Sequence, residues 1–204
     1  MPLKLFSRIS NKKTSPDAIT IVSGLPRSGT SMMMQMLQAG GLEILTDNQR
    51  SADDDNPKGY YEFERVKKLK DGDTQWVQAA QGKCVKVISA LLEHLPKEYT
   101  YQIVFMLRSI DEILASQKQM LVRRQEPTDR VSDEKLAGLF QSHLSSIREW
   151  LDRQPNIRVL YINYNDLIQN PKPLVEEISA FLDTPVDTLA MLEIPDRQLY
   201  RQRS

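Results

Sequence analysis

The sequence has very few of the residues that form disulfide frameworks and zinc sites. Among its 204 residues are one cysteine, Cys84, and two histidines. A single cysteine cannot form a disulfide within the chain, and so few ligands argue against the usual four-ligand zinc site. The composition therefore argues against both a disulfide-stabilised module and a zinc domain. It is typical of a reducing compartment, and we expect a cytoplasmic protein.

Excess charge of either sign and long hydrophobic runs are also lacking. Lysine and arginine together number 27, as do aspartate and glutamate, so no overall field attracts the protein to nucleic acid or a membrane surface. No run approaches the ~18 apolar residues of a membrane helix. We therefore expect no nucleic-acid partner and no integral membrane segment. Residues 1–18 are interpreted as a flexible basic arm, followed by a single domain over residues 19–204.

What the chain does have is a regular alternation of strand and helix patterns. Short apolar runs rich in β-branched residues predict strands, and helical patterns lie between and after them. The predicted strands span residues 19–23, 84–88, 102–107 and 157–162, and the predicted helices span residues 31–39, 110–124, 133–153 and 171–182. Ser109 and Glu112 have the spacing of a capping box at the start of the second helix. Strands that are apolar on both faces predict a three-layer α/β domain, with a central parallel sheet flanked by helices.

A glycine-rich loop joins the first predicted strand to the first predicted helix. Gly24 and Gly29 have the spacing of a phosphate-binding P-loop, in the strand–loop–helix context that the motif requires. Glycines let successive backbone N–H groups turn toward one anion, and the start of the helix adds its positive dipole end. Thr30 occupies the position of the lysine in an ATPase loop, so Arg27 is the cation inside this loop. The sequence predicts a site for a phosphorylated nucleotide.

The segment Pro26–Ser31 resembles the 5′-phosphosulfate-binding loop of the sulfotransferase family, bacterial type. Its sequence is similar to the family pattern Pro-(Lys/Arg)-Ser-Gly-Thr-(Thr/Ser). Family members transfer a sulfuryl group from 3′-phosphoadenosine-5′-phosphosulfate (PAPS). The resemblance implies PAPS as the sulfuryl donor, and no metal is expected. The residues of this loop that it implies in cofactor binding are Gly24, Arg27, Ser28, Gly29, Thr30 and Ser31.

A second stretch extends the resemblance to the nucleotide 3′-phosphate. The family follows a later strand with an arginine and, eight positions on, a serine, which together hold this phosphate. Arg108 and Ser116 have that spacing here. Eight residues are slightly more than two helical turns, so Ser116 returns to roughly the same helix face. Both side chains are therefore expected to face one phosphate.

Two further stretches near the C-terminus complete the predicted cofactor site. Residues 159–167 resemble the Tyr-Glu-Asp-Leu block of the family, with Asn165 in place of the usual glutamate. This likeness implies that Tyr164 packs on the adenine. Arg197 and Arg201 are expected to close over the cofactor phosphates, although the glycine-rich C-terminal motif of the family is absent.

Two residues are candidates for the chemistry. Lys86 interrupts an apolar strand and resembles the lysine that relatives use near the transferred group; an edge-strand lysine turned to solvent is the alternative. Many relatives have a catalytic histidine two residues later, where this chain has Ile88. Other branches use a glutamate that follows the first helix. Glu62 is the matching candidate for the general base, with Glu64 as the second choice.

The sequence therefore predicts a PAPS-dependent sulfotransferase that acts on an acceptor hydroxyl or amine and binds PAPS and its product PAP. Two other hypotheses remain. A P-loop kinase or NTPase would need the loop lysine and a strand-terminal aspartate for magnesium, and the predicted strands have neither. A non-enzymatic protein that binds PAPS or PAP would keep the loop without needing a base. The sequence does not identify the acceptor.

Overall fold

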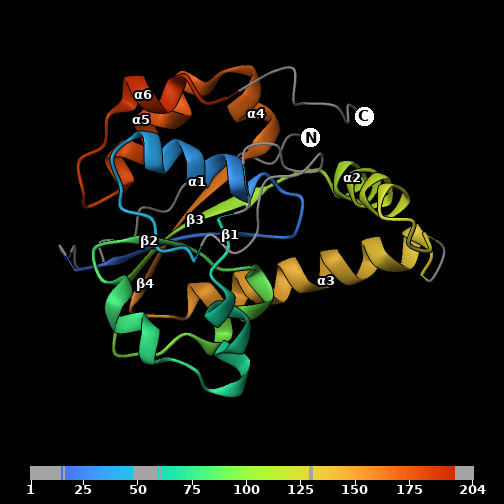
Figure 1. The fold of residues 1–204 in the computed structure, drawn as a ribbon, viewed down its shortest axis with the longest axis horizontal. Coiled ribbons are helices and arrows are strands. Elements are labelled where there is room, and N and C mark those ends of the chain that lie inside the picture. Colours follow the sequence, from blue (N-terminus) through green and yellow to red (C-terminus); the bar gives the residue numbers. More distant parts are fainter. Residues whose placement is uncertain (1–14, 16, 48–58, 60, 129–130, 196–204) are drawn as a thin grey trace.

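The computed structural model describes residues 15, 17–47, 59, 61–128 and 131–195. In this part of the chain, four parallel strands form one sheet in the order β2-β1-β3-β4 (Figure 1). The strands are β1 (Ile19–Gly24), β2 (Cys84–Lys86), β3 (Tyr101–Leu107) and β4 (Ile157–Asn163). The α-helices are α1 (Thr30–Ala39), α2 (Ile110–Arg123), α3 (Asp133–Asp152), α4 (Tyr164–Gln169), α5 (Pro171–Phe181) and α6 (Thr188–Leu192). Three 3₁₀ helices are η1 (Glu64–Asp71), η2 (Gln75–Ala80) and η3 (Ser89–His94).

Alternate strand residues form two separate hydrophobic cores, one on each face of the sheet. On one face Val22 and Met106 pack with residues of α1, α4, α5 and α6. On the other face Ile21 and Phe105 pack with residues of α3 and the 3₁₀ helices. Figure 1 shows these two helical layers on opposite sides of the sheet. The predicted three-layer α/β fold is confirmed, and the strands are buried on both faces as their apolar runs indicated.

Several element boundaries differ from the prediction. The strand predicted over residues 84–88 ends at Lys86, and Ile88 beyond it is 40% exposed. The helix predicted over residues 171–182 ends at Phe181 and is followed by α6, which the sequence patterns did not predict. The polar segment before β2 also forms two 3₁₀ helices, η1 and η2. Short helices of this kind give weak periodic signals because they complete only one or two turns.

The parallel arrangement places three functional segments at one edge of the sheet. The carboxyl ends of β1, β2 and β3 lead into the glycine-rich loop, the segment after Lys86, and Arg108, respectively. Ligands of open parallel sheets bind outside the carboxyl ends of the strands.

In the part of the chain that the structure describes, no helix is long and apolar enough to cross a bilayer. Residues 1–14 and 16 of the predicted arm lie outside the described residues, so the domain boundary after residue 18 stays a prediction.

Candidate nucleotide and acceptor site

The loop between β1 and α1 contains three residues with positive φ. These are Gly24 at 146°, Arg27 at 69° and Gly29 at 95°. Only glycine adopts such angles without steric cost, so the left-handed Arg27 is held by its surroundings. Ser28 is buried, and its hydroxyl donates to the carbonyl oxygen of Leu25 at 2.7 Å. This bond closes the loop into a tight turn immediately before the helix.

The two loop glycines are also required by close neighbours. A Cβ atom on Gly24 would lie 2.7 Å from the carbonyl oxygen of Met106 on β3. A Cβ atom on Gly29 would lie 2.3 Å from Cδ2 of Tyr164. Real Cβ atoms do not approach other atoms so closely, so both positions need glycine for space as well as for conformation. The first N–H groups of an α-helix have no acceptor within the helix, so the loop and the start of α1 together have the features that favour anion binding.

Three of the predicted cofactor residues meet beside this loop. Nε of Arg27 donates to the hydroxyl of Ser116 on α2 at 3.0 Å. Nη1 of Arg108, which follows β3, donates to the carbonyl oxygen of Arg27 at 3.0 Å. The structure thus brings together the loop, the end of β3 and α2. Arg108 and Ser116 are linked through Arg27, so these residues can surround one phosphate group.

A buried carboxylate holds Arg108 in place. Oε2 of Glu112 accepts from Nε of Arg108 at 2.8 Å, and the two side chains are 2% and 8% exposed. Oε1 of Glu112 accepts from Nδ2 of Asn165 at 2.8 Å. The capping box predicted for Ser109 and Glu112 is wrong, because Ser109 makes no capping bond with its side chain. The carboxylate instead pairs with the guanidinium one helical turn earlier, an i,i+4 pair that the sequence spacing could have indicated.

Arg108 keeps the capacity to bind an anion. Its bonds to Glu112 and to the loop use two of the five N–H donors of a guanidinium. The Arg108 guanidinium carbon lies 4.6 Å from the centre of the Tyr164 ring, a cation–π contact. Burial raises the pKa of the Tyr164 phenol, and the nearby guanidinium opposes that shift. Tyr164 therefore packs against the loop and Arg108; its predicted contact with adenine stays a prediction.

Lys86 points to the same side of the sheet as the loop helix. Its ammonium donates to the hydroxyl of Ser31 in the first turn of α1 at 3.1 Å. Of the two orientations considered for Lys86, the structure thus shows the one toward the loop. Arg27, Lys86 and Arg108 thus lie around the loop, and Glu112 is paired with Arg108. These cations and the glycine turn suit an anionic ligand.

Glu62 lies beside the strand that carries Lys86. Ile44 pairs in parallel with Cys84, and the N–H of Leu45 donates to the carbonyl oxygen of Cys84 at 2.8 Å, so the segment that follows α1 runs along β2. The hydroxyl of Thr46 donates to the carbonyl oxygen of Glu62 at 2.8 Å. Glu62 is therefore tied to the segment that runs along the edge strand β2.

The two candidate base residues share one cation. Nζ of Lys67 lies 3.6 Å from Oε2 of Glu62 and 2.6 Å from Oε1 of Glu64. The hydrogen bond to Glu64 is the main reason that the pKa of Lys67 is raised. The Glu62 side chain is 21% exposed and that of Glu64 is 40% exposed. Glu62 is thus the more enclosed of the two carboxylates.

Four further residues bear on the catalytic and cofactor assignments. Ile88, at the position of the family histidine, is exposed and outside β2. His143 on α3 lies 2.9 Å from the hydroxyl of Ser89, a contact that joins α3 to η3. Arg197 and Arg201 lie outside the described residues. Within the described ranges no group of three or more His, Cys, Asp or Glu side chains could hold a metal ion.

The fold and the loop first define a class of protein, the α/β domains with a phosphate-binding loop after the first strand of a parallel sheet. A family profile described as the sulfotransferase domain matches residues 17–199. The chain therefore belongs to the sulfotransferase family, and the resemblance found in the sequence is confirmed. A search of curated proteins gives no significant match.

Solved structures with the same fold are distant in sequence. The sulfotransferase domain from the curacin biosynthetic pathway aligns over 88% of this chain and 78% of its own, with 14% identity and a TM-score of 0.50. The mouse sulfotransferase SULT7A1, solved in complex with PAP, aligns over 90% of this chain, with 18% identity and a TM-score of 0.52. This chain spans 64% of the length of the mouse protein. At such identity these structures support the fold alone.

Proposed function

We propose that this sulfotransferase-family protein is an enzyme that transfers a sulfuryl group from PAPS to an acceptor hydroxyl or amine. The donor assignment is supported by one observation above all. Arg27, Arg108 and Ser116, which are separated by up to 89 residues in the sequence, meet within hydrogen-bond distance beside the glycine loop. PAPS carries phosphates at two positions, and this cluster next to a phosphate loop provides a separate partner for each.

The residues around the donor have distinct proposed roles. The backbone of the loop, with Ser28, Thr30 and Ser31, binds the 5′-phosphosulfate, and Arg27 neutralises it. Arg108 and Ser116 bind the 3′-phosphate. Glu112 and Asn165 position Arg108 through the bonds described above. Among the C-terminal residues, Arg197 and Arg201 are proposed to close over the phosphates.

Lys86 and Glu62 are proposed to act on the transfer itself. The acceptor oxygen or nitrogen forms a bond to sulfur while the bond between sulfur and the bridging phosphate oxygen breaks. The electron pair of the broken bond remains on that oxygen, and PAP departs. Lys86, held by Ser31 at the start of α1, stabilises the charge that develops on the bridging oxygen. Glu62 accepts the acceptor proton as general base.

The proposed location is the cytoplasm. The only cysteine, Cys84, is buried and unpaired, and burial raises the pKa of its thiol above the ordinary value. A thiol of this kind is stable in a reducing compartment and needs no partner. We also propose that residues 19–204 form a single catalytic domain behind a basic arm of residues 1–18.

The direct test of this function is incubation of the full chain with PAPS and fractionated cell extract, followed by mass spectrometry. The expected result is an acceptor that gains the mass of one sulfuryl group, with PAP formed in equal amount. The Lys86→Ala variant serves as the control, because it should bind PAPS and form little product. PAP binding without a sulfated product in any fraction would instead support a non-enzymatic role.

A further inference from the structure

The two edges of the sheet differ in how their main-chain groups are used. At the β2 edge, Ile44 pairs in parallel with Cys84, and the N–H of Leu45 donates to the carbonyl oxygen of Cys84 at 2.8 Å. The segment after α1 therefore covers this edge. At the other end of the strand order, β4 pairs with β3 alone among the described residues. The chain thus closes one edge itself and leaves the other open.

The register shows which groups of β4 face outward. The N–H of Tyr101 on β3 donates to the carbonyl oxygen of Asn156 at 2.9 Å, and main-chain groups alternate in direction along a strand. The even-numbered residues of β4 therefore bond to β3, and the N–H and C=O groups of Val159 and Tyr161 point away from the sheet. Within the described ranges these outward groups have no main-chain partner.

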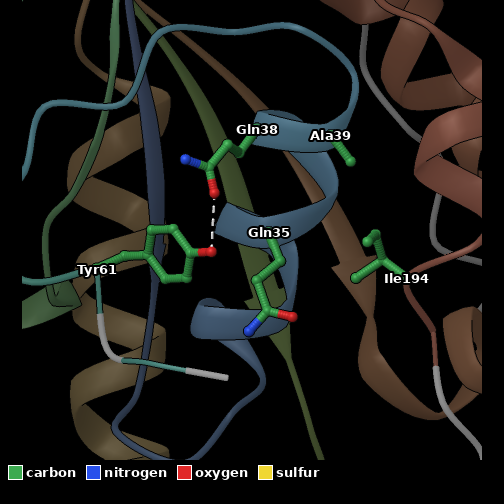
Figure 2. A pocket seen from close by; sticks show the side chains of 5 residues that line it. All are labelled: Gln35, Gln38, Ala39, Tyr61 and Ile194. Atoms are coloured by element: carbon green, nitrogen blue, oxygen red, sulfur yellow. Dashed lines mark hydrogen bonds between the residues drawn. The ribbon is translucent and has the colours of Figure 1, made fainter. Parts of the chain in front are cut away.

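The β4 edge differs in this respect from the hollow of about 350 Å³ beside α1. There the hydroxyl of Tyr61 donates to Oε1 of Gln38 at 2.8 Å, so two polar groups of the lining already bond to each other (Figure 2). A ligand that used these groups would have to break their bond. A strand added to β4 breaks no bond within the chain, because it uses groups that point outward.

The sequence of β4 lacks the features that usually keep an edge strand from pairing. Natural proteins protect such edges with prolines, bulges, free charges or very short strands. β4 has seven residues in unbroken register with β3 and contains no proline. Its one charged side chain, that of Arg158, is buried and bonded to Asp183 and to the carbonyl oxygen of Phe181. The edge is therefore suited to pairing with a further strand.

Two charges of α3 border the open edge. On the face of the sheet covered by α4 and α5 Leu160 is buried, whereas Val159 and Tyr161 on the α3 face are only half-buried. The guanidinium carbon of Arg148 lies 4.7 Å from the centre of the Tyr161 ring. Burial raises the pKa of the Tyr161 phenol; the charge of Arg148 lowers it and that of Asp152 raises it. Both charges of α3 therefore lie near this ring.

These charges make the edge complementary to itself. Arg148 and Asp152 are both exposed, and a spacing of four residues places them on one side of α3. A two-fold axis beside β4 would place α3 of a second copy antiparallel to the first, so that Arg148 of each copy faces Asp152 of the other. The chain has no net charge, so no overall repulsion opposes the contact. We propose that the β4 edge is a dimer interface, at which β4 pairs antiparallel with β4 of a second copy.

The covered β2 edge determines how far such an assembly can grow. Pairing of β4 with β2 of the next copy would be head-to-tail and could continue as a fibre. Residues 43–45 already occupy the β2 edge, so this pairing is blocked. Pairing of β4 with β4 uses the same edge of both copies and closes after two. The proposed sulfuryl transfer does not require this dimer, so the two proposals stand or fall separately.

Sedimentation equilibrium of the full chain over a range of concentrations tests the proposal. The expected result is a reversible dimer with twice the 23.5 kDa mass of the chain. Amide hydrogen exchange then locates the contact, because the N–H groups of Val159 and Tyr161 should exchange more slowly as the concentration rises. A monomer at every concentration would overturn the proposal. So would slow exchange at these amides in a monomer, which would show that the chain covers its own edge.

Charge reversal tests the complementarity of the two α3 helices. Arg148→Asp would place two carboxylates opposite each other at both contacts, so the dimer should dissociate about tenfold more readily. Adding Asp152→Arg restores opposite charges and should restore most of the affinity. Lys135→Asp, which changes an exposed cation near the start of the same helix, is the matched control and should have no effect. Equal dissociation constants for wild type, Arg148→Asp and the double variant would contradict the proposed arrangement.

A proline in β4 tests the strand pairing itself. The N–H of Val159 points away from β3, so Val159→Pro removes no bond of the sheet and blocks an added strand. The variant should be a folded monomer, with circular dichroism as the check on folding. A folded Val159→Pro variant that dimerises as tightly as wild type would show that the copies meet at another surface.

Discussion

The nucleotide side and the acceptor side of the candidate site are built differently. On the nucleotide side, bonds join residues 81 and 89 positions apart in the sequence, and the Arg108–Glu112 pair is almost fully buried. On the acceptor side, Glu62 is attached through its backbone to Thr46, and its side chain faces Lys67, which is 58% exposed. The first region is an internally bonded cluster, whereas the second is a surface segment between short helices.

This difference suggests that the two regions contribute differently to nucleotide binding and to turnover. A cluster whose donors are already oriented binds a fixed ligand with little reorganisation, which suits one nucleotide. Surface segments are held by fewer interactions and tolerate change in sequence and position. We therefore expect nucleotide binding to survive changes on the acceptor side, and turnover to respond to changes on both sides.

The largest expected effect is on the acceptor side. Glu62→Gln keeps the size of the side chain but removes the proton acceptor, so turnover should fall by roughly a hundredfold to ten-thousandfold. The affinity for PAP should stay within a small factor, because Glu62 is not one of the proposed phosphate ligands and its carboxylate lies 3.6 Å from Nζ of Lys67. Steady-state rates and calorimetry measure the two quantities.

The matched control for this variant is Glu93→Gln, which changes an exposed glutamate on η3 and should leave turnover unchanged. Full activity in Glu62→Gln would show that the base is another residue. Loss of activity in Glu64→Gln, with PAP binding intact, would identify Glu64 as the base.

The second-largest expected effect distinguishes the roles of Lys86 and Arg27, the two cations beside the start of α1. Lys86→Ala should lower turnover by about a hundredfold to a thousandfold and change PAP affinity little, since Lys86 acts on charge that develops during transfer. Arg27→Ala should mainly weaken PAP binding, because Arg27 meets charge already present. Lys83→Ala, which breaks an exposed ion pair with Glu43 before β2, is the control. Unchanged turnover in Lys86→Ala would exclude its catalytic role.

Alanine substitutions at two glycines test how closely the residues on the nucleotide side are packed. Gly29 and Gly41 have φ angles of 95° and 96°, so alanine at either position carries a similar backbone cost. A Cβ on Gly29 would collide with Tyr164, whereas a Cβ on Gly41 would meet nothing within 4 Å. Gly29→Ala should therefore lower the affinity for PAP about tenfold or more. It should also lower the melting temperature further than Gly41→Ala does. Equal effects of the two changes on binding and melting would contradict the packing described for Tyr164.

The smallest expected effect concerns alkaline pH. Burial raises the pKa of Tyr164 above its ordinary value of 10.0. Because the folded pKa is the higher one, the stability that the neutral phenol contributes is present below about pH 10 and is lost as pH rises through the folded pKa. Urea titrations at a series of pH values should show unfolding free energy falling above about pH 10, and Tyr164→Phe should make the fall shallower. An equally steep fall in the variant would exclude Tyr164 as a contributor.

Much of the fold could be predicted because its signals are local. The apolar runs at β1, β3 and β4 and the amphipathic pattern of α3 each fall within one or two residues of the observed bounds. The strand at residues 84–88 was predicted too long because Val87 and Ile88 continue the apolar run. The chain leaves the sheet there, and Ile88 becomes exposed.

The candidate site was predictable where it depends on a motif and less so where it depends on tertiary contact. The spacing of Gly24 and Gly29 indicated the loop, and the interval from Arg108 to Ser116 indicated that these two side chains lie together, which their bonds to Arg27 confirm. The roles of Glu112 and Asn165 were missed because their bond joins α2 to α4 across 53 residues. The bond from Tyr61 to Gln38 on α1 was missed for the same reason.

The central claim is that Arg108 and Ser116 recognise a 3′-phosphate next to the loop. Calorimetry of the wild-type chain with PAP and with AMP, which lacks that phosphate, tests it most directly. We expect PAP to bind about ten- to a hundredfold more tightly, as a charge-assisted hydrogen bond of roughly 1.5–3 kcal/mol implies, and Arg108→Ala to remove most of the preference. Circular dichroism of the variant checks that it is folded. Equal affinities of PAP and AMP for the wild type would contradict the account.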